Sequence, residues 1–422
     1  MSDHVPSLRR GFLWTFAGNA VFAASQWGIL VILTKMGSTA AVGRFALASA
    51  IATPAMLFAN MQLRSVLVAD TAGDYPFRDY LSARLAMLPA ALVVIALVAG
   101  LGYSSTQAAT ILVFGLARAV EGVSDILYGP AQKRERLDLI AISMIAKGLI
   151  SLALFGGLFY LTGSLVWALV ALPIGWALPL LGFDLPCCRR LLGESAALRP
   201  RWQAANLRRL IWLALPLGLV LLLIQLRHTV PRLLLESARG EDELGIFAAL
   251  SYVVIVGNTV VLALSQASIA RLARARAASD VRAFAATVRQ LVACGVGLGA
   301  AGVAVAWSLG EPVLRLLYSA EYAKHQDLFV LVMIGGGVMY VGSLLGAPAT
   351  AMRAFRVQLW IQLANALLLF GAGRLLIPGH GMLGAAWTVI AGAVWVTAAY
   401  ALVVARGLRR LGAPTPLAEA TS

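Results

Sequence analysis

Three charged side chains lie in one apolar stretch of the sequence, residues 107–128: Arg118, Glu121 and Asp125. In a helix, positions i, i+3 and i+7 lie on one face. A charged side chain at mid-bilayer costs on the order of 3 kcal/mol on insertion scales, so it needs a partner or water. This face is therefore either an internal ion pair with a structural role or one wall of a hydrated cavity. We favour the cavity, in which Glu121 and Asp125 pair with cations or bind a coupling ion.

Further cations lie in other apolar stretches. Arg64 follows the polar sequence Asn60-Met-Gln62-Leu, Lys147 lies about two turns into a later stretch, and Arg227 is near the end of another. Arg64 is close enough to a predicted span end for its side chain to reach the membrane surface instead of a cavity. The intramembrane cations outnumber the acids. We therefore predict a cavity that binds an anionic substrate through Arg64, Arg118, Lys147 and Arg227.

Uncharged amide side chains in the apolar stretches can also form hydrogen bonds. Pairs of amides seven or eight residues apart share a helical face in the first and the eighth predicted spans. We predict that six amides line the cavity: Asn19, Gln26, Asn60, Gln62, Asn258 and Gln266.

The composition indicates the class of protein that carries these residues. Hydrophobic residues make up 60% of the 422 positions, charged residues 13%, and the mean hydropathy is +0.84. So little polar surface cannot cover a soluble globule of this length, and we predict an all-α integral membrane protein. The formal net charge of +15 then reflects topology and contact with anionic membrane lipids.

Other classes of function lack their usual sequence signals. Cys187, Cys188 and Cys294 form no CxxC pair, and the four histidines are scattered, so we expect neither a metal site nor a cofactor. The sequence has no GxxxxGK[ST] phosphate loop, which argues against ATP hydrolysis. The longest predicted outside loops, 229–244 and 310–326, are too short for a catalytic domain. We expect a transporter and not an enzyme.

Twelve apolar runs are long enough to span a bilayer. Assigning alternate sides places 23 of the 34 basic residues inside, eight outside and three within spans, which puts both termini in the cytoplasm. Only four of the 34 are lysine, an arginine bias typical of a GC-rich bacterial genome, so the expected location is the bacterial inner membrane. The predicted spans are 12–33, 43–66, 82–100, 107–128, 139–161, 164–185, 210–228, 245–268, 290–309, 327–349, 358–376 and 382–404.

A basic connector, Cys187 to Arg209, divides the spans into two halves. The connector contains six arginines and one acid, Glu194, and this excess of positive charge indicates a cytoplasmic loop. Nucleic-acid binding is a poor alternative, because the spans on both sides hold the connector at a membrane surface. We predict an N-terminal six-helix bundle at 1–186, the connector at 187–209, and a C-terminal six-helix bundle with a short cytoplasmic tail at 210–422.

The two halves carry a weak internal repeat. LRRGFLW at 8–14 matches LRRLIW at 207–212, and VGRFAL at 42–47 matches LGIFAA at 244–249. Six spans before the connector mean that both halves start from the same side of the membrane. The repeat must then be parallel, with a pseudo-twofold axis along the membrane normal.

The first two spans, the Gly43-Arg-Phe-Ala46 opening and the Gln62-Leu-Arg64 exit together resemble a known superfamily. The chain is similar over its whole length to the polysaccharide-transport branch of the multidrug/oligosaccharidyl-lipid/polysaccharide exporters, whose O-antigen and lipopolysaccharide flippases carry undecaprenyl-diphosphate-linked saccharides across the inner membrane. The resemblance implies two six-helix bundles around a cavity that opens alternately to each side. Of the predicted cations, Arg64 alone is supported by a family motif.

The resemblance implies a flippase of polyprenyl-diphosphate-linked saccharide, with cavity cations attracting the diphosphate. The implied partners are the lipid-linked oligosaccharide or polysaccharide precursor, membrane lipids and other polysaccharide-assembly proteins. One alternative is an ion-coupled multidrug antiporter, in which Glu121 or Asp125 would bind the coupling proton or sodium ion. A second alternative is a membrane glycosyltransferase or polysaccharide polymerase, which would need a long outside loop.

Overall fold

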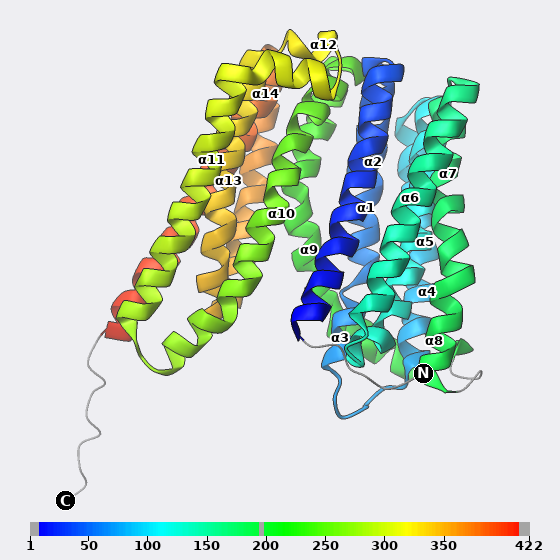
Figure 1. Cartoon of the computed structure of the whole chain (residues 1–422), viewed down its shortest axis with the longest axis vertical. Coiled ribbons are helices and arrows are strands. Elements are labelled where there is room, and N and C mark those ends of the chain that lie inside the picture. The colour runs from blue at the N-terminus through cyan, green and yellow to red at the C-terminus, as the bar shows by residue number, and fades with distance from the viewer. Residues whose placement is uncertain (1–7, 194–197, 413–422) are drawn as a thin grey trace, which may run out of the picture. The chain divides into compact units, whose positions relative to one another are not determined.

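The computed structural model describes residues 8–193 and 198–412, and these ranges contain helices and no strand (Figure 1). This confirms the predicted all-α class; Glu194 lies outside the described residues. The elements are α1 (Leu8–Met36), α2 (Thr39–Asn60), α3 (Leu63–Ala69), α4 (Phe77–Gly102), α5 (Ser105–Lys133), α6 (Leu137–Thr162), α7 (Leu165–Pro179), the π-helical segment η1 (Leu180–Asp184), α8 (Leu185–Leu192), α9 (Ala204–Arg239), α10 (Glu241–Ala277), α11 (Val281–Leu317), α12 (Ala320–Ala323), α13 (Gln326–Ala351) and α14 (Phe355–Gly412).

Ten helices within the described ranges are long and apolar enough to cross a membrane. The chain is therefore a multi-pass membrane protein. The 29-residue helix α5 is not among the ten, and it is the helix that carries Arg118, Glu121 and Asp125. The tenth lies in α14, whose 58 residues would measure roughly 87 Å as one straight helix, far more than a bilayer is thick.

Helix α14 is in fact two antiparallel arms. Gly381 breaks the helix with a φ of 53°, a value that glycine adopts readily. The arms then pack together: Trp395 Nε1 donates to the Ile361 carbonyl at 3.2 Å, and Gln362 donates to the Tyr400 hydroxyl at 3.2 Å. Figure 1 shows α14 changing from orange to red along its two arms. Counting both arms and α5 would give twelve spans, and that number remains a prediction.

By packing, the chain divides into two compact units, Met1–Ala248 and Ala249–Ser422. The first contains α1 to α9 and the beginning of α10, and the second contains the rest. The bundle boundaries predicted from the sequence, at 186 and 210, remain predictions.

Two interhelical turns support a repeat between the halves. In the α5–α6 turn, the amide of Arg136 donates to the Ala131 carbonyl at 2.9 Å, and Glu135 has a φ of 57°. In the α13–α14 turn, the amide of Ala354 donates to the Ala349 carbonyl at 3.0 Å, and Arg353 has a φ of 58°. A proline, Pro130 or Pro348, stands directly before each accepting residue. The α10–α11 turn has the same hydrogen bond without the proline, so the shared proline is the more specific sign of a repeat.

The repeated glycines of the G-x-F-A sequences meet within the first unit. A methyl group on Gly43 would lie 1.9 Å from the Glu241 carbonyl oxygen, and one on Gly245 would lie 2.0 Å from the Thr39 carbonyl oxygen. The start of α2 therefore contacts the start of α10 reciprocally, each through its glycine. An ion pair of 3.2 Å between Arg44 and Glu241 joins the same two helix starts.

Gly43→Ala is expected to destabilise the protein by about 1–3 kcal/mol, because the methyl group must displace the backbone of α10. The measurement is the midpoint of thermal unfolding of the full chain in detergent. Gly100→Ala is the matched control, since Gly100 is also helical and no atom lies within 4 Å of its added methyl group. Equal midpoints for the two variants would show that the close approach of α2 and α10 contributes nothing.

Candidate functional site

The polar sequence from Asn60 to Arg64 breaks a helix inside the first unit. Helix α2 ends at Asn60, α3 begins at Leu63, and the two residues between them, Met61 and Gln62, have φ values of 43° and 53°. Non-glycine residues rarely adopt this left-handed conformation, and residues that do so cluster at active sites and ligand-binding sites. The break directs Asn60 from the last turn of α2 and Arg64 from the first turn of α3 toward the same charged residues.

Asp125 on α5 pairs with two arginines near this helix break. Its Oδ2 accepts from Arg84 Nη2 at 2.8 Å, and its Oδ1 lies 3.1 Å from Arg64 Nη1. Arg84, on α4, also donates through Nη1 to Asn60 Oδ1. The Arg84 side chain is fully buried, whereas those of Asp125 and Arg64 are 23% and 34% exposed. A buried guanidinium thus fixes the carboxylate, while the second arginine remains accessible.

Arg118 and Glu121 form a separate pair on the same helix. Arg118 Nη1 lies 3.5 Å from Glu121 Oε2, and their side chains are 19% and 31% exposed. Arg118 Nε is buried without a hydrogen-bond partner. The sequence placed Arg118, Glu121 and Asp125 on one face of α5, but Asp125 pairs with Arg84 and Arg64 and not with Arg118.

The charges of the two groups of residues just described, around Asp125 and around Glu121, do not cancel. Three arginines on α3, α4 and α5 stand against the two carboxylates of α5, which leaves one excess positive charge. We name this set the arginine cluster: Arg64, Arg84, Arg118, Glu121 and Asp125. Because the side chains of two of the three arginines, Arg64 and Arg118, are partly exposed, the cluster can accept an anion, and guanidinium groups suit the paired oxygens of phosphate.

Lys147 lies in a second, drier cluster. Its Nζ donates to Asp184 Oδ2 and to the Tyr128 hydroxyl, both at 2.7 Å, and the Tyr128 hydroxyl lies 2.7 Å from Ser143 Oγ. The Lys147 and Asp184 side chains are only 2% and 1% exposed. Asp184 ends η1, the π-helical segment that follows Pro179. We call these four residues the lysine cluster.

The remaining predicted residues lie apart from these clusters or bind locally. Arg227 on α9 donates through Nε to His228 Nε2 at 3.0 Å. Asn19 is exposed and donates to the Thr15 carbonyl, and Gln62 accepts from Ser65. Gln26 Nε2 and Asn258 Oδ1 are buried without hydrogen-bond partners, and Gln266 is exposed.

Comparison with known proteins places the chain in a family. The family described as "Polysaccharide biosynthesis protein" matches residues 8–275, more than half of the chain. The chain belongs to this family. The relatedness predicted from the G-x-F-A and Gln62-Leu-Arg64 sequences is thereby confirmed.

A sequence relative of this family member agrees with that assignment, and two solved structures share its fold. The capsular polysaccharide biosynthesis protein CapF of Staphylococcus aureus is 28% identical over 383 residues, which are 90% of this chain and 95% of that protein. The lipid II flippase MurJ, in an inward closed conformation, matches with a TM-score of 0.74 and 10% identity over 95% of this chain and 90% of that one. An inward-facing multidrug resistance MATE family transporter of the MOP superfamily matches with a TM-score of 0.69 and 14% identity over 94% of each chain. At such identities, the two structures show a shared fold.

Several residues of the two clusters in this polysaccharide biosynthesis family member were not predicted. Arg84 was among the 23 basic residues counted as inside, because it lies only two residues after the start of the predicted span 82–100. Asp184, Tyr128 and Ser143 were not predicted at all. The signal for Asp184 was available, since it is an acid inside the apolar run that ends at the Cys187-Cys188 pair. An intramembrane acid generally implies a nearby cation.

Proposed function

We propose that this family member is a flippase that carries polyprenyl-diphosphate-linked saccharide across the bacterial inner membrane, with both termini in the cytoplasm. The observation that carries the proposal is the arginine cluster, which has one excess positive charge and partly exposed guanidinium groups. A diphosphate offers the oxygens that such groups bind in pairs. The family and the relative CapF support a polysaccharide precursor as the cargo.

Within the arginine cluster, Arg118 is the proposed substrate contact. Its ion pair with Glu121, at 3.5 Å, is the longest in the cluster, and its Nε has no hydrogen-bond partner. Arg64 would assist, because it is the most exposed cation of the set. Lys147 is held by Asp184 and Tyr128, so it could contact substrate only after leaving Asp184. Other polysaccharide-assembly proteins are proposed as partners.

Arg118→Gln is expected to leave the protein inserted and abundant but to make lipid-linked saccharide accumulate in the inner leaflet. The loss follows from removing one positive charge and a planar donor pair from the cluster. The measurement is the amount of lipid-linked saccharide in cells in which the variant is the only copy, beside the amount of variant in the membrane. Arg239→Gln is the matched control, since Arg239 lies in the last turn of α9, at the helix end and away from the cluster. Normal saccharide levels with abundant Arg118→Gln would contradict the proposed contact.

Orientation is proposed on charge alone. Reporter fusions after Arg209 should give a cytoplasmic signal, and fusions near Glu241 and Tyr322 periplasmic ones. A periplasmic signal after Arg209 would overturn the proposed topology.

A further inference from the structure

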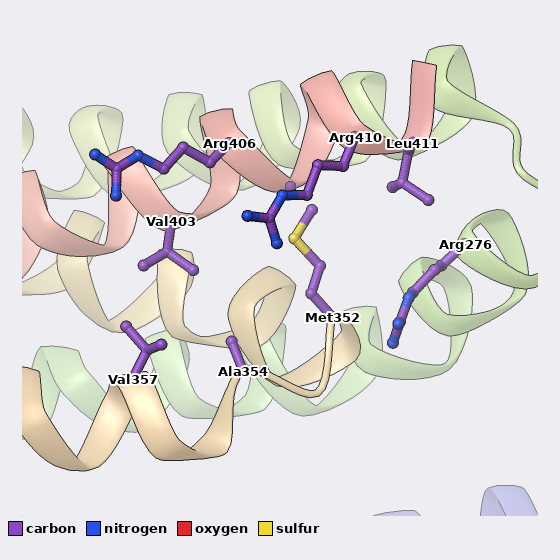
Figure 2. A pocket seen from close by; sticks show the side chains of 9 residues that line it. Arg276, Met352, Ala354, Val357, Val403, Arg406, Arg410 and Leu411 are labelled. Carbon is purple, nitrogen blue, oxygen red and sulfur yellow. The ribbon is translucent and has the colours of Figure 1, made fainter. Parts of the chain in front are cut away.

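A pocket of about 390 Å³ lies at one end of the helices of the second unit, Ala249–Ser422 (Figure 2). Arg276 in the last turn of α10 contributes one side, Arg406 and Arg410 near the end of α14 contribute another, and Met352 in the α13–α14 turn lies between them. All of these residues are close to helix ends. The pocket therefore sits at the depth at which membrane-spanning helices reach the lipid head groups.

The polar groups of this pocket are three arginines without an acid. Arg276 is positioned by its Nη1, which donates to the Ala351 carbonyl at 2.8 Å. Arg406 and Arg410 are four residues apart, so they project from one face of α14. Figure 2 shows the Arg410 guanidinium beside the Met352 sulfur. No carboxylate is among the lining residues, so the positive charges are available to an anion.

The rest of the pocket lining is apolar. Val357, Val403 and Met352 line it, and the remaining apolar lining residues are alanine, glycine and leucine. The lining thus offers hydrocarbon contact next to the arginines. It has no aromatic, amide or hydroxyl side chain, the groups with which a site would bind a saccharide. A ligand with a phosphate on a hydrocarbon chain fits this lining better than a sugar or a free phosphate.

A second pocket with the same chemistry lies in the first unit. It is at the end of α8 and is lined by Arg189, Arg190 and Arg199, while the rest of its described lining is leucine, proline and glycine. Three arginines beside an apolar wall thus line a pocket in each of the two units. A feature that recurs at the ends of two helices, α8 and α14, is less easily explained as a chance arrangement of surface arginines.

We propose that the pocket formed by Arg276, Arg406 and Arg410 binds the phosphate of an anionic phospholipid from the adjacent leaflet. The arginines contact the phosphate oxygens, and the acyl chains lie along Val357 and Val403. Basic residues at a membrane surface each add to the affinity for anionic lipid, by roughly fivefold at about 1 kcal/mol per residue. Bound phospholipid would join α10, the α13–α14 turn and the end of α14. This site is distinct from the arginine cluster and does not depend on the proposed transport function.

The test uses the full chain in detergent and native mass spectrometry, with phosphatidylglycerol or phosphatidylcholine added. The wild type should retain phosphatidylglycerol in preference to phosphatidylcholine, and Arg406→Gln/Arg410→Gln should reduce that retention by about 25-fold. The matched control is Arg274→Gln/Arg409→Gln, which removes two arginines from the same ends of α10 and α14 without changing the pocket lining. This control should retain phosphatidylglycerol like the wild type.

Each contrary outcome overturns the proposal. An equal loss of phosphatidylglycerol in both double variants would show a diffuse basic surface instead of a site. Displacement of bound phosphatidylglycerol by an equal concentration of inorganic phosphate would show a free-phosphate site. Equal retention of phosphatidylcholine and phosphatidylglycerol by the wild type would show that the arginines do not select an anionic head group.

Discussion

Asp125→Asn is expected to destabilise the protein by about 3–5 kcal/mol and to abolish most transport. Asp125 is the carboxylate that pairs with both Arg84 and Arg64, and Arg84 is fully buried. Removing one partner of a buried ion pair leaves an uncompensated charge, which accounts for the expected size of the effect. The Arg84 side chain would then be hydrogen-bonded only by neutral amides, that of Asn60 and the one introduced by the substitution, and these cannot balance its charge. The measurement is the unfolding midpoint in detergent, beside the saccharide level in cells.

Glu121→Gln is the matched control for this prediction. It also removes one carboxylate from α5, but Glu121 is 31% exposed and lies 3.5 Å from its partner, so its loss should cost about 1 kcal/mol or less. The double variant Arg84→Met/Asp125→Asn should regain much of the stability, because it removes the buried charge as well. A midpoint for Asp125→Asn equal to that of Glu121→Gln would contradict the structural role given to Asp125.

Lys147→Met is expected to have a comparable effect through the lysine cluster. It would leave Asp184 about 1% exposed with no counter-charge, and Asp184 Oδ1 already has no hydrogen-bond partner. The expected loss is about 3–5 kcal/mol, seen as a lower unfolding midpoint. Lys147→Met/Asp184→Leu should recover the midpoint, since a buried ion pair can be replaced by apolar side chains at little cost.

Transport by that double variant decides what the lysine cluster does. A stable double variant without transport would show that the charges themselves take part in the transport cycle, which is the result we expect. A stable double variant with normal saccharide levels would confine Lys147 and Asp184 to a structural role. A midpoint for Lys147→Met equal to that of the wild type would contradict the buried ion pair.

Helix positions could be predicted from the sequence because each span must bury its own backbone hydrogen bonds in an apolar run. Ten of the predicted runs fall within single helices or arms, whereas the run predicted at 164–185 begins one residue before α7 and continues through η1 to the first residue of α8. The run predicted at 43–66 instead crosses a break, since α2 ends at Asn60 and α3 begins at Leu63. The left-handed Met61 and Gln62 that make this break carry no sequence signal of their own, because neither is glycine.

The charged residues were predicted one helix at a time, and this is why their partners were missed. Spacing within α5 places Arg118 and Glu121 on one face, and in the structure they lie 3.5 Å apart. Asp125 instead pairs with arginines that lie 41 and 61 positions earlier in the sequence, a consequence of how α3, α4 and α5 pack. The same holds for Lys147 and Asp184, 37 positions apart. Spacing along one sequence cannot supply contacts that depend on tertiary packing.

The antiporter alternative makes a different use of the same residues. A cation-binding site would need free carboxylates, whereas Asp125 is shared by two arginines and Glu121 is paired with Arg118 at 3.5 Å. A cluster with excess positive charge also repels cationic drugs. The charges described here therefore favour an anionic cargo over a cationic one.

Translocation by the purified protein is the most direct test of the proposed function. The full chain would be reconstituted in vesicles that contain a polyprenyl-diphosphate-linked saccharide, and the saccharide on the outer surface would be measured with a membrane-impermeant lectin. We expect the wild type to move the lipid-linked saccharide between leaflets and Arg118→Gln to do so at a small fraction of that rate. Equal movement by the wild type, by Arg118→Gln and by vesicles without protein would contradict this expectation.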